Sequence, residues 1–326
     1  MSGALTYLEP VIDCSAPALP AMIGPELERA ANFAQAANAA STRRAYGTDF
    51  RIFTSWCQDR GLSALPARSE AVAAFLAYEA EQGAKPSTIG RRCAAIRYGH
   101  RLAGEPNPTA DERVKAVLRG IRRTVGAAPR RMAPATADRI IAMAPRPDST
   151  LTSLRDRALL LLGFAGAFRR SELVALDVAD IERLPEGLRV TIRRGKTDQE
   201  GHGATIAIVR GEVACPVAAV VAWLEAAVIT DGPVFRPIRR GGHVQPQRLT
   251  DRSVANIVKT HAERVGLDPA QFAGHSLRAG FLTSAAKRGA SLFKMMATSR
   301  HKSTDTLAGY VRDQEIFRDH AGAGLL

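Results

Sequence analysis

The feature that most limits how this chain can fold is a stretch without hydrophobic periodicity, residues 126–134, which contains two prolines and separates two long segments of regular pattern. A chain of 326 residues also exceeds what one ordinary hydrophobic core organises. We therefore predict a helical domain over residues 25–125, a linker over 126–134 and a second domain over 135–326. Residues 1–24, which hold three further prolines, are expected to form a flexible N-terminal arm.

The pattern of residues 25–125 is helical, because apolar side chains recur every three to four residues. Ser41 and Ser69 stand before two such repeats and are expected to cap their helices, and Ser87 opens a third. A fourth repeat ends near Ile121. On the last two helices the arginines occupy positions between the apolar ones, so we expect them to face away from the core.

The second domain changes its hydrophobic period once. Residues 188–192 and 204–209 alternate between apolar and polar side chains on either side of a polar interruption, which predicts a β-hairpin with a long tip. Helical patterns are found at residues 135–144, 152–165, 215–229, 251–265, 276–288, 291–299 and 303–313. The expected fold class is therefore mainly α, with a small antiparallel β-sheet in the second domain.

The balance of charge indicates a polyanionic partner. The formal net charge is +13, which favours nucleic acid first and an acidic membrane surface second. The excess is local, because residues 85–131 hold twelve basic and three acidic side chains, whereas residues 1–84 hold six basic and nine acidic. Clustered basic residues are typical of phosphate contacts. The competing explanation is a GC-rich genome that encodes arginine in place of lysine on an ordinary solvated surface.

Ten arginines are the candidates for these phosphate contacts. They are Arg43, Arg44, Arg91, Arg92, Arg97, Arg119, Arg122, Arg123, Arg130 and Arg131. All of them lie in the first domain or the linker, so we predict that this part of the chain binds double-stranded DNA.

Several classes of protein are disfavoured by what the sequence lacks. The sequence contains no run of about 18 apolar residues, so it predicts no membrane span. Residues 1–20 do not have the form of a signal peptide. The four cysteines are far apart in the chain, which favours reduced thiols in a cytoplasmic protein over a zinc site or disulfides. No Asp/Glu cluster has metal-ligand spacing and no glycine-rich phosphate loop follows a strand, so we expect neither a metal nor a nucleotide cofactor.

Two pairs of polar residues recur at a spacing of three. Arg169 and Glu172 follow a strongly apolar segment, and His275 and Arg278 stand at a predicted helix start. Residues three apart share one face of a helix, and a helix N-terminus favours an anion. The ordinary explanation of the first pair is a surface ion pair, and that of the histidine is a structural role. Taken alone, neither pair identifies a function.

Three further groups complete a set that could break and rejoin a phosphodiester. Lys196 lies in the polar tip of the predicted hairpin, from which an ammonium group can protonate a leaving oxygen. His301 lies in a basic loop, and Tyr310 follows it by nine residues on a helix that Ser303 or Thr304 caps. A tyrosine hydroxyl can attack phosphorus while cationic groups hold the phosphate. The alternative for Tyr310 is an interfacial tyrosine with its hydroxyl in water.

The order and spacing of these groups resemble the tyrosine recombinase (integrase) family. The segments that carry the resemblance are Gly166-Ala-Phe-Arg-Arg-Ser-Glu-Leu-Val-Ala-Leu176, Gly195-Lys-Thr-Asp-Gln-Glu-Gly201, Gly274-His-Ser-Leu-Arg-Ala-Gly280 and His301-Lys-Ser-Thr-Asp-Thr-Leu-Ala-Gly-Tyr310. The resemblance is strong over residues 150–315. It is looser over residues 40–125, which are similar to the helical, SAM-like core-binding domain of the family.

The resemblance implies a site-specific DNA recombinase or integrase, such as that of a mobile element, that uses neither a metal nor ATP. Tyr310 would be the nucleophile and would form a 3′-phosphotyrosyl intermediate. Arg169 and Arg278 would hold the non-bridging oxygens of the phosphate and stabilise the transition state. Lys196 would be the general acid for the leaving 5′-oxygen.

The resemblance also implies supporting roles and partners. His275 would assist proton transfer, His301 would hydrogen-bond the phosphate, and Glu172 would support Arg169 or His275. Family members act on double-stranded DNA as tetramers that join two sites, so a homotetramer is expected here. Residues 311–326 would then be a C-terminal tail that docks on a neighbouring protomer.

Two positions depart from the usual pattern of the family. Ser299-Arg300 stands where Leu-Gly usually precedes the histidine that matches His301, and Phe168 replaces the usual leucine before the first arginine. Neither change removes a reactive group, so we expect activity. Because no extra DNA-binding domain fits before residue 25, the expected layout is the two-domain one of Cre or Xer recombinases.

Three other functions stay open on the sequence alone, and one of them is binding of an acidic membrane or of RNA in place of duplex DNA. A type IB topoisomerase would use the same tyrosyl chemistry on single duplexes. A catalytically silent DNA-binding protein would bind a site without forming a covalent link, although it would have no need for the complete reactive set.

Overall fold

The structure is a computed structural model. It describes residues 39–126, 132–146, 150–193 and 203–315, together with a few single residues before residue 34. The side chains of residue 306 and of residues 311–315 are not described. The chain divides into two units, Met1–Arg130 and Arg131–Leu326. This division falls inside residues 126–134, where the sequence predicts a linker. The predicted arm over residues 1–24 lies outside the described residues.

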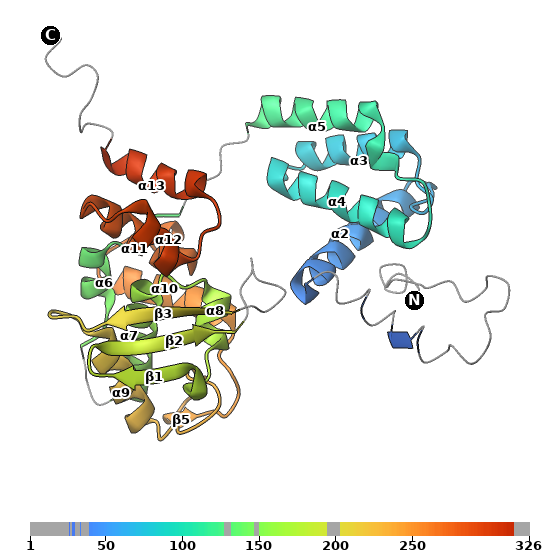
Figure 1. Ribbon diagram of the computed structural model, residues 1–326. Coiled ribbons are helices and arrows are strands. Elements are labelled where there is room, and N and C mark those ends of the chain that lie inside the picture. The colour runs from blue at the N-terminus through green and yellow to red at the C-terminus, as the bar shows by residue number, and fades with distance from the viewer. Residues whose placement is uncertain are drawn as a thin grey trace, which may run out of the picture. The chain divides into compact units, whose positions relative to one another are not determined.

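The first unit is a helical bundle around an aromatic core (Figure 1). Its elements are α2 (Ala40–Gln58), α3 (Ser69–Glu81), α4 (Pro86–Leu102), the 3₁₀ turn η3 (Pro108–Ala110) and α5 (Glu112–Val125). Phe53 and Phe75 are fully buried, with their ring centroids 5.1 Å apart, and Trp56 packs against both rings. The apolar repeats of the sequence therefore form one core, as helical periodicity predicts.

Two of the predicted helix caps are wrong. Helix α2 begins at Ala40, so Ser41 lies inside its first turn, and Ser69 is the first residue of α3 rather than its cap. Neither helix has a capping side-chain hydrogen bond at its start. In α2 the good helix former Ala40 extends the helix beyond the serine.

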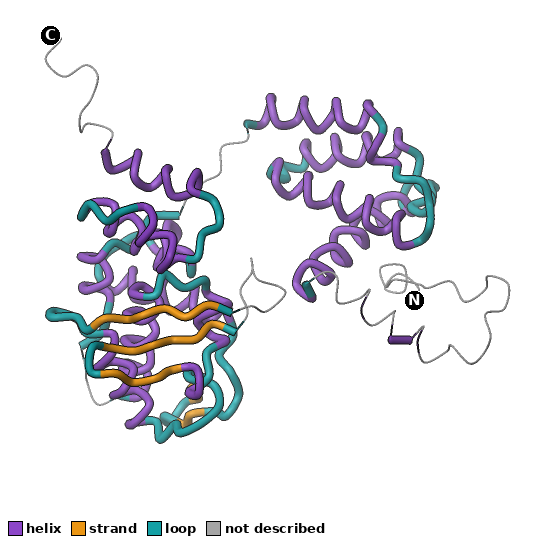
Figure 2. Tube along the Cα trace, in the orientation of Figure 1, coloured by secondary structure: helices purple, strands orange, loops and turns teal. Residues whose placement is uncertain are grey.

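The second unit packs helices against a three-stranded antiparallel sheet (Figure 2). Its strands, in sheet order, are β1 (Ile181–Leu184), β2 (Gly187–Ile192) and β3 (Ala204–Val209). Val190 of β2 pairs with Ile206 of β3, and both side chains are buried beside the helices. The predicted hairpin between residues 188–192 and 204–209 is therefore confirmed.

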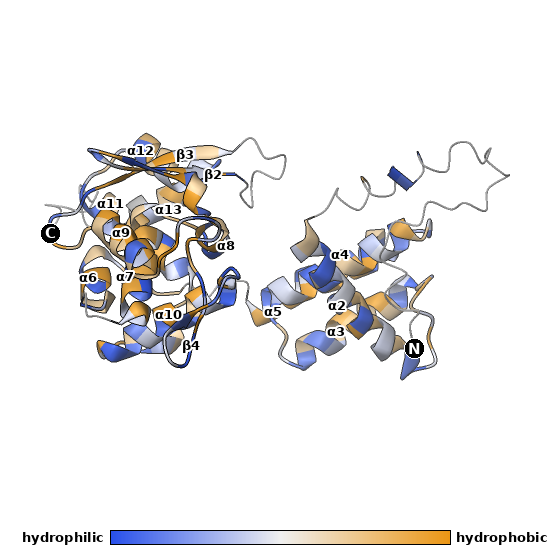
Figure 3. Cartoon of the chain, turned by 90° about the horizontal axis from the view of Figure 1, so that it is seen from below, coloured by the Kyte–Doolittle hydropathy of each residue, from blue (hydrophilic) through white to orange (hydrophobic). Residues whose placement is uncertain are grey.

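Most of the second unit is helical. Its helices are α6 (Ala137–Met143), α7 (Leu151–Ala165), α8 (Arg170–Ala175), α9 (Pro216–Ala226), α10 (Asp251–Arg264), α11 (His275–Lys287), α12 (Leu292–Ser299) and α13 (Thr304–Glu315), with 3₁₀ turns η4 (Val178–Asp180) and η5 (Pro269–Gln271). Figure 3 shows α7 and α9 as largely hydrophobic, which fits their place at the centre of the main core. The predicted helices are all present within a few residues.

Four short elements were not predicted from the sequence. They are α8, β1 and the two-residue strands β4 (Ile238–Arg239) and β5 (His243–Val244). A helix of six residues has fewer than two turns, and strands of two to four residues have too few positions to establish an alternation. Their conformation follows from the segments that they contact.

A small separate core joins the last three helices. Leu282 of α11, Met295 of α12 and Leu307 of α13 are buried together. Tyr310 packs against this cluster from α13. The apolar faces of these three helices therefore decide where the tyrosine lies relative to α11.

Helix α11 is also fixed to the segment that begins the second unit. The backbone N–H of Ala135 donates to the carbonyl of Ser276, 2.9 Å away. Gly280 of α11 faces the same segment, and a Cβ at this position would overlap the carbonyl oxygen of Ala135. The close approach of α11 requires glycine here, because any side chain would push the two backbones apart.

We therefore expect Gly280→Ala to destabilise the second unit by about 3 kcal/mol, the upper end of what overpacking costs. The matched control is Gly120→Ala in α5, where an added Cβ meets nothing within 4 Å. That control should be neutral or stabilising by up to about 1 kcal/mol. Urea unfolding and hydrogen-exchange protection of α11 measure the difference. Equal stability of the two variants would contradict the close packing of α11.

Candidate active site

Four of the segments that carry predicted reactive residues meet in the second unit (Figure 1). Arg169 stands directly before α8, Arg278 lies on α11, His301 follows α12, and Tyr310 lies on α13. Helices α11, α12 and α13 share the small core, and α11 also packs against α7, which leads into Arg169. Residues far apart in the sequence are thus brought to one place by packing.

Arg169 is held by the residue three positions further along the chain. The Glu172 carboxylate accepts from the backbone N–H of Arg169 at 3.0 Å through Oε2 and from its guanidinium at 2.5 Å through Oε1. The Glu172 side chain is only 2% exposed. The predicted pair is therefore not an exposed ion pair, because it caps α8 and fixes the arginine at the same time.

Arg278 is a buried cation, with 1% of its surface exposed. Its Nη1 donates to the carbonyl of Ala167 at 2.7 Å, in the short loop that leads to Arg169. Burial first, and then the positive charges of Arg169 and Arg300, lower the pKa of Arg278. An arginine stays protonated in proteins. The lowered pKa therefore reflects an unfavourable electrostatic energy of the buried guanidinium, which a bound anion would reduce.

His301 lies against Arg278, whose Nη2 is 3.2 Å from Nε2 and 3.3 Å from Nδ1 of the imidazole. The Nδ1 atom is also 2.8 Å from the hydroxyl of Ser299. The single hydroxyl proton of Ser299 is donated to the carbonyl of Met295 at 2.6 Å. The hydroxyl oxygen must then accept from Nδ1–H, which leaves Nε2 of the neutral imidazole without a proton, as an acceptor.

The electrostatic surroundings of His301 oppose its protonation. Burial first, and then the charges of Arg278, Arg169, His275 and Arg300, lower the pKa of His301 to about 4. The imidazole is therefore neutral at pH 7 in the free protein.

Tyr310 and His275 belong to the same electrostatic cluster. A charge on Tyr310 raises the pKa of Arg278, and the charge of His275 lowers the pKa of His301. Tyr310 is half-buried against the core of α11 to α13, whereas His275 is exposed at the first residue of α11. The predicted helix start at His275 is confirmed, and the hydroxyl of Ser303 accepts from the backbone N–H of Asp305 at the start of α13, as predicted.

One predicted site residue cannot be placed. Lys196 falls in residues 194–202, which lie outside the described residues between β2 and β3. Within the described ranges no group of three His, Cys, Asp or Glu side chains has an arrangement that could hold a metal ion. In the same ranges, none of the helices combines the length and the apolar character that crossing a membrane requires.

Two residues near the site were not among the sequence candidates. Ser299 and Arg300 were treated as departures from a family pattern, yet Ser299 contacts His301 and Arg300 contacts Glu172. The only signal for them in the sequence was that departure itself, and it did not indicate what either side chain contacts.

The predicted DNA-binding arginines of the first unit differ in their surroundings. The exposed ones are Arg44, Arg91, Arg97, Arg119, Arg122 and Arg123. Arg97 and Arg122 both lie close enough to Cys93 to lower its pKa, against the larger effect of burial, which raises it. Arg97 of α4 and Arg122 of α5 therefore lie near the same buried thiol. Arg130 and Arg131 lie outside the described residues.

The expectation that Arg92 faces away from the core is wrong. Its side chain is 16% exposed and forms an ion pair with Glu79, which is itself buried. Asp49, 1% exposed, accepts from Arg91 at 2.6 Å and lies 3.8 Å from Arg92. A buried carboxylate requires a cationic partner, and two such carboxylates turn Arg92 inward at the edge of the apolar face.

Comparison with known protein families gives matches to both units. Residues 130–315 match the phage integrase family, and residues 33–104 match the N-terminal SAM-like domain of phage integrases. The first of these matches spans more than half of the chain.

Similar proteins are recombinases. The chain is 41% identical over 287 residues to an integrase/recombinase XerD homologue of Selenomonas ruminantium, across 86% of this chain and 84% of that protein. It is 25% identical over 283 residues to the recombinase Cre of Escherichia phage P1, across 81% of each chain.

Solved structures show the same fold. The XerH site-specific recombinase in its post-cleavage complex with a palindromic difH substrate has a TM-score of 0.65 at 15% identity, covering 92% of this chain and 84% of that one. A lambda integrase dimer bound to a COC′ core site has a TM-score of 0.60 at 16% identity, covering 89% and 76%. With both of its units and most of its length matched, the chain belongs to the phage integrase family of tyrosine recombinases.

Proposed function

We propose that this site-specific DNA recombinase cleaves and rejoins double-stranded DNA through Tyr310. The proposal is carried by one observation, which is that Tyr310 packs on the core that also joins α11, which carries Arg278, to α12, which precedes His301. A phosphate bound to these two side chains would lie within the same cluster as the tyrosine hydroxyl. The names of similar proteins, which include recombinases and an integrase in complex with DNA, support this reaction.

The proposed reaction conserves the phosphodiester energy. The Tyr310 hydroxyl gives up its proton, which we assign to the imidazole of His275 as acceptor. The phenolic oxygen attacks phosphorus, the bond from phosphorus to the 5′-oxygen breaks, and a 3′-phosphotyrosyl bond forms. The leaving 5′-oxygen receives a proton, which we assign to the ammonium group of Lys196. Attack by a 5′-hydroxyl of the partner duplex reverses these steps and joins the new strands.

Arg169 and Arg278 are proposed to hold the non-bridging oxygens of the phosphate. Both are fixed before the substrate arrives, one by Glu172 and the other by the carbonyl of Ala167. Preorganised cations of this kind stabilise the charge of a pentacoordinate transition state without reorganisation, at a typical gain of about 100-fold to 1000-fold for each donor. Glu172 is proposed to support Arg169.

His301 is proposed to hydrogen-bond the phosphate as an imidazolium. Its Nδ1–H is already donated to Ser299, so only a proton on Nε2 would allow the ring to donate to a phosphate oxygen. A phosphate anion favours this proton, whereas Arg278 opposes it in the free protein. His275, which is exposed beside this cluster, is proposed to assist proton transfer.

The first unit is proposed to grip the same duplex through phosphate contacts. Arg44, Arg97, Arg119, Arg122 and Arg123 are exposed, and such contacts release counterions from DNA. Arg91 and Arg92 have guanidinium groups already paired with Asp49 and Glu79, so they would contribute less. Arg43, Arg130 and Arg131 remain candidates from the sequence.

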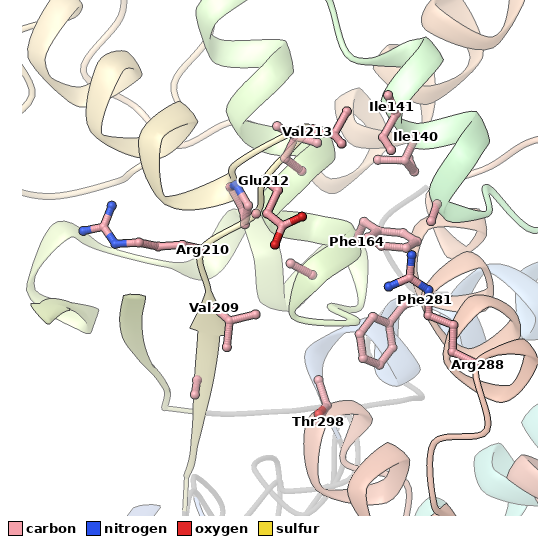
Figure 4. A pocket seen from close by; sticks show the side chains of 17 residues that line it. Ile140, Ile141, Phe164, Val209, Arg210, Glu212, Val213, Phe281, Arg288 and Thr298 are labelled. Carbon is pink, nitrogen blue, oxygen red and sulfur yellow. The ribbon is translucent and has the colours of Figure 1, made fainter. Parts of the chain in front are cut away.

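The active assembly is proposed to be a homotetramer on two DNA sites, in which residues 311–326 dock on a neighbouring protomer. A groove of about 630 Å³ lies beside α6, α7 and α11 and is lined by Ile141, Phe164, Val213 and Phe281 (Figure 4). Val213 is 77% exposed. The tail carries Ile316, Phe317 and a terminal Leu-Leu, so its apolar side chains match those of the groove.

The biological role proposed for this reaction is DNA integration or resolution, as in a mobile genetic element. A transposon integrase with the same fold is one of the solved structures that resemble this chain. A cytoplasmic location is proposed with it, because the DNA of a bacterial cell lies in that compartment.

We expect wild-type protein to form a covalent complex with duplexes that carry a nick near the cleavage site, since the short strand released by cleavage cannot return. The duplexes are selected from a randomised inverted-repeat pool by capture of protein–DNA adducts under denaturing conditions. Tyr310→Phe should reduce the adduct by more than about 1000-fold, because the nucleophile is absent.

The matched control is Tyr46→Phe, in which a tyrosine of the first unit loses its hydroxyl and the adduct should persist. An adduct of equal yield in Tyr310→Phe would exclude this tyrosine as the nucleophile. Relaxation of supercoiled plasmid without any joining of two sites would instead indicate a topoisomerase.

We expect His301 to titrate with a midpoint near pH 4 in the free protein, as measured by the ¹⁵N shifts of its imidazole. Cognate DNA should raise this midpoint, because the phosphate stabilises the imidazolium. Proton uptake on binding then means that DNA affinity rises as the pH falls below the pKa of the complex, and that it levels off below the pKa of the free protein, about 4. His301→Gln, which also identifies the resonances, should lose this component of the pH dependence.

Ser299→Ala serves as a second control for the same titration. It removes the acceptor of Nδ1–H, so the neutral ring should become a mixture of tautomers while DNA-free protein remains folded. A midpoint near 6.5 in the wild-type free protein, the usual value for histidine, would show that the ring does not lie against Arg278.

Removal of residues 316–326 is expected to leave cleavage of single sites within a few-fold of wild type and to abolish the joining of two sites. Val213→Asp should have the same effect, because it replaces an exposed apolar side chain of the groove with a charged one. Phe293→Asp is the matched control, since Phe293 is 82% exposed and does not line the groove. Synaptic complexes are measured on native gels. Normal synapsis by the shortened chain would rule out tail docking.

A further inference from the structure

The residue before His301 has an unusual backbone conformation for its type. Arg300 ends α12 in the left-handed region, with φ 57° and ψ 38°, and its N–H donates to the carbonyl of Met296 at 2.7 Å. Glycine adopts this conformation freely, whereas a residue with a Cβ does so at an energetic cost. The side chain of Arg300 must therefore make contacts that offset the strain, or the strain must serve the site.

The side chain of Arg300 folds back and binds the loop that precedes Arg169. Its Nη1 donates to the carbonyls of Thr298 at 2.6 Å and Gly166 at 3.1 Å, and its Nη2 lies 3.3 Å from the carbonyl of Ala167. The guanidinium carbon lies 5.3 Å from the ring centroid of Phe168. The two positions that depart from the family pattern, Arg300 and Phe168, are thus in direct contact.

Arg300 also shares the carboxylate that holds Arg169. Its Nη2 donates to Oε2 of Glu172 at 2.9 Å, while Oε1 accepts from Arg169. Burial raises the pKa of Glu172, but the charges of Arg300 and Arg169 and the hydrogen bonds from Arg169 bring it below its usual value. The carboxylate is therefore ionised and held between two guanidinium groups.

Arg300 itself is not placed to bind a substrate. Its side chain is 11% exposed, and both terminal nitrogens are committed to protein oxygens. The backbone of the loop it contacts is itself strained, since Ala167 has φ 45°. The carbonyl of that residue is bound by Arg278 and Arg300 together. Arg300 thus connects the supports of both phosphate-binding arginines.

We propose that Arg300 is a positioning residue of the strand-cleavage reaction, which fixes Glu172 and the 166–168 loop so that the guanidinium of Arg169 meets the scissile phosphate in the right place. This assignment rests on the proposed function. A positioning role of Arg300 can be told from a purely structural role as the cap of α12 by its effect on the chemical step. A misplaced Arg169 slows cleavage at saturating DNA without weakening DNA binding.

The test uses the full chain and the nicked duplexes selected by the wild-type protein. Arg300→Gly keeps the left-handed backbone without strain, so the variant should fold. We expect its single-turnover cleavage rate at saturating protein to fall by about 10-fold to 100-fold, with the Kd for DNA within about 2-fold of the wild-type value. Arg300→Lys should remain slow, because an ammonium group cannot replace a planar fork that binds four oxygens.

Two further readouts separate positioning from stability. Loss of the Arg300 charge leaves the buried Glu172 with one cationic partner, so the pKa of Glu172 rises. Cleavage by Arg300→Gly should therefore begin to fail at a higher pH than cleavage by wild type as the solution is acidified. Added guanidinium ion should restore part of the rate of this variant, whereas sodium chloride at the same ionic strength should not.

The matched control is Val228→Gly, which relieves a left-handed residue, φ 51°, at a position that is 81% exposed and outside the site. Its cleavage rate and pH profile should equal those of wild type. If Arg300→Gly cleaves at the wild-type rate and with the wild-type pH profile, the inference is overturned. The proposed function is still upheld in that case, because the wild-type protein cleaves DNA. A wild-type protein that forms no adduct with any duplex would overturn both.

Discussion

The buried carboxylate of Glu172 is the group on which the geometry of the site depends. It caps α8 through the backbone of Arg169, pairs with the guanidinium of Arg169 and pairs with Arg300 from beyond α12. A carboxylate removed from water is stable only when its charge and lone pairs are satisfied. Loss of one partner from such a buried pair typically costs about 3–5 kcal/mol. The loop before α8 and the turn after α12 are therefore held together by the carboxylate of Glu172.

The cluster around this carboxylate concentrates positive charge. Arg169, Arg278 and Arg300 lie near one another, and their mutual repulsion is expressed in the lowered pKa of Arg278 and of His301. Strained backbone at Ala167 and Arg300 adds to the cost. The hydrophobic packing of α7 and of α11 to α13 keeps these groups in place. A site that is electrostatically incomplete without an anion is suited to bind a phosphate.

Much of the fold could be predicted because the periodicity of apolar residues depends only on residues that are close together in the sequence. The helices of both units and the β2–β3 hairpin follow from three-to-four-residue and two-residue repeats. Elements such as α8 and β1 are too short to show a repeat. Arg92 lies at the edge of an apolar face, where period alone does not decide its direction, and the buried carboxylate of Glu79 turns it inward.

The sequence by itself determined which reactive groups exist and in which order they occur, from Arg169 to Tyr310. It also determined the division into two units, because residues 126–134 carry no pattern that could bury them in either core. Those properties depend on residue identity and on local spacing.

Only the tertiary structure decided how the groups act on one another. Arg300 and Glu172 are 128 residues apart, and nothing local to either predicts their pairing. The tautomer of His301 likewise depends on where the hydroxyl proton of Ser299 is donated. Hydrogen-bond direction and charge interaction depend on distances between side chains, and those distances exist only after α7, α11, α12 and α13 have packed together.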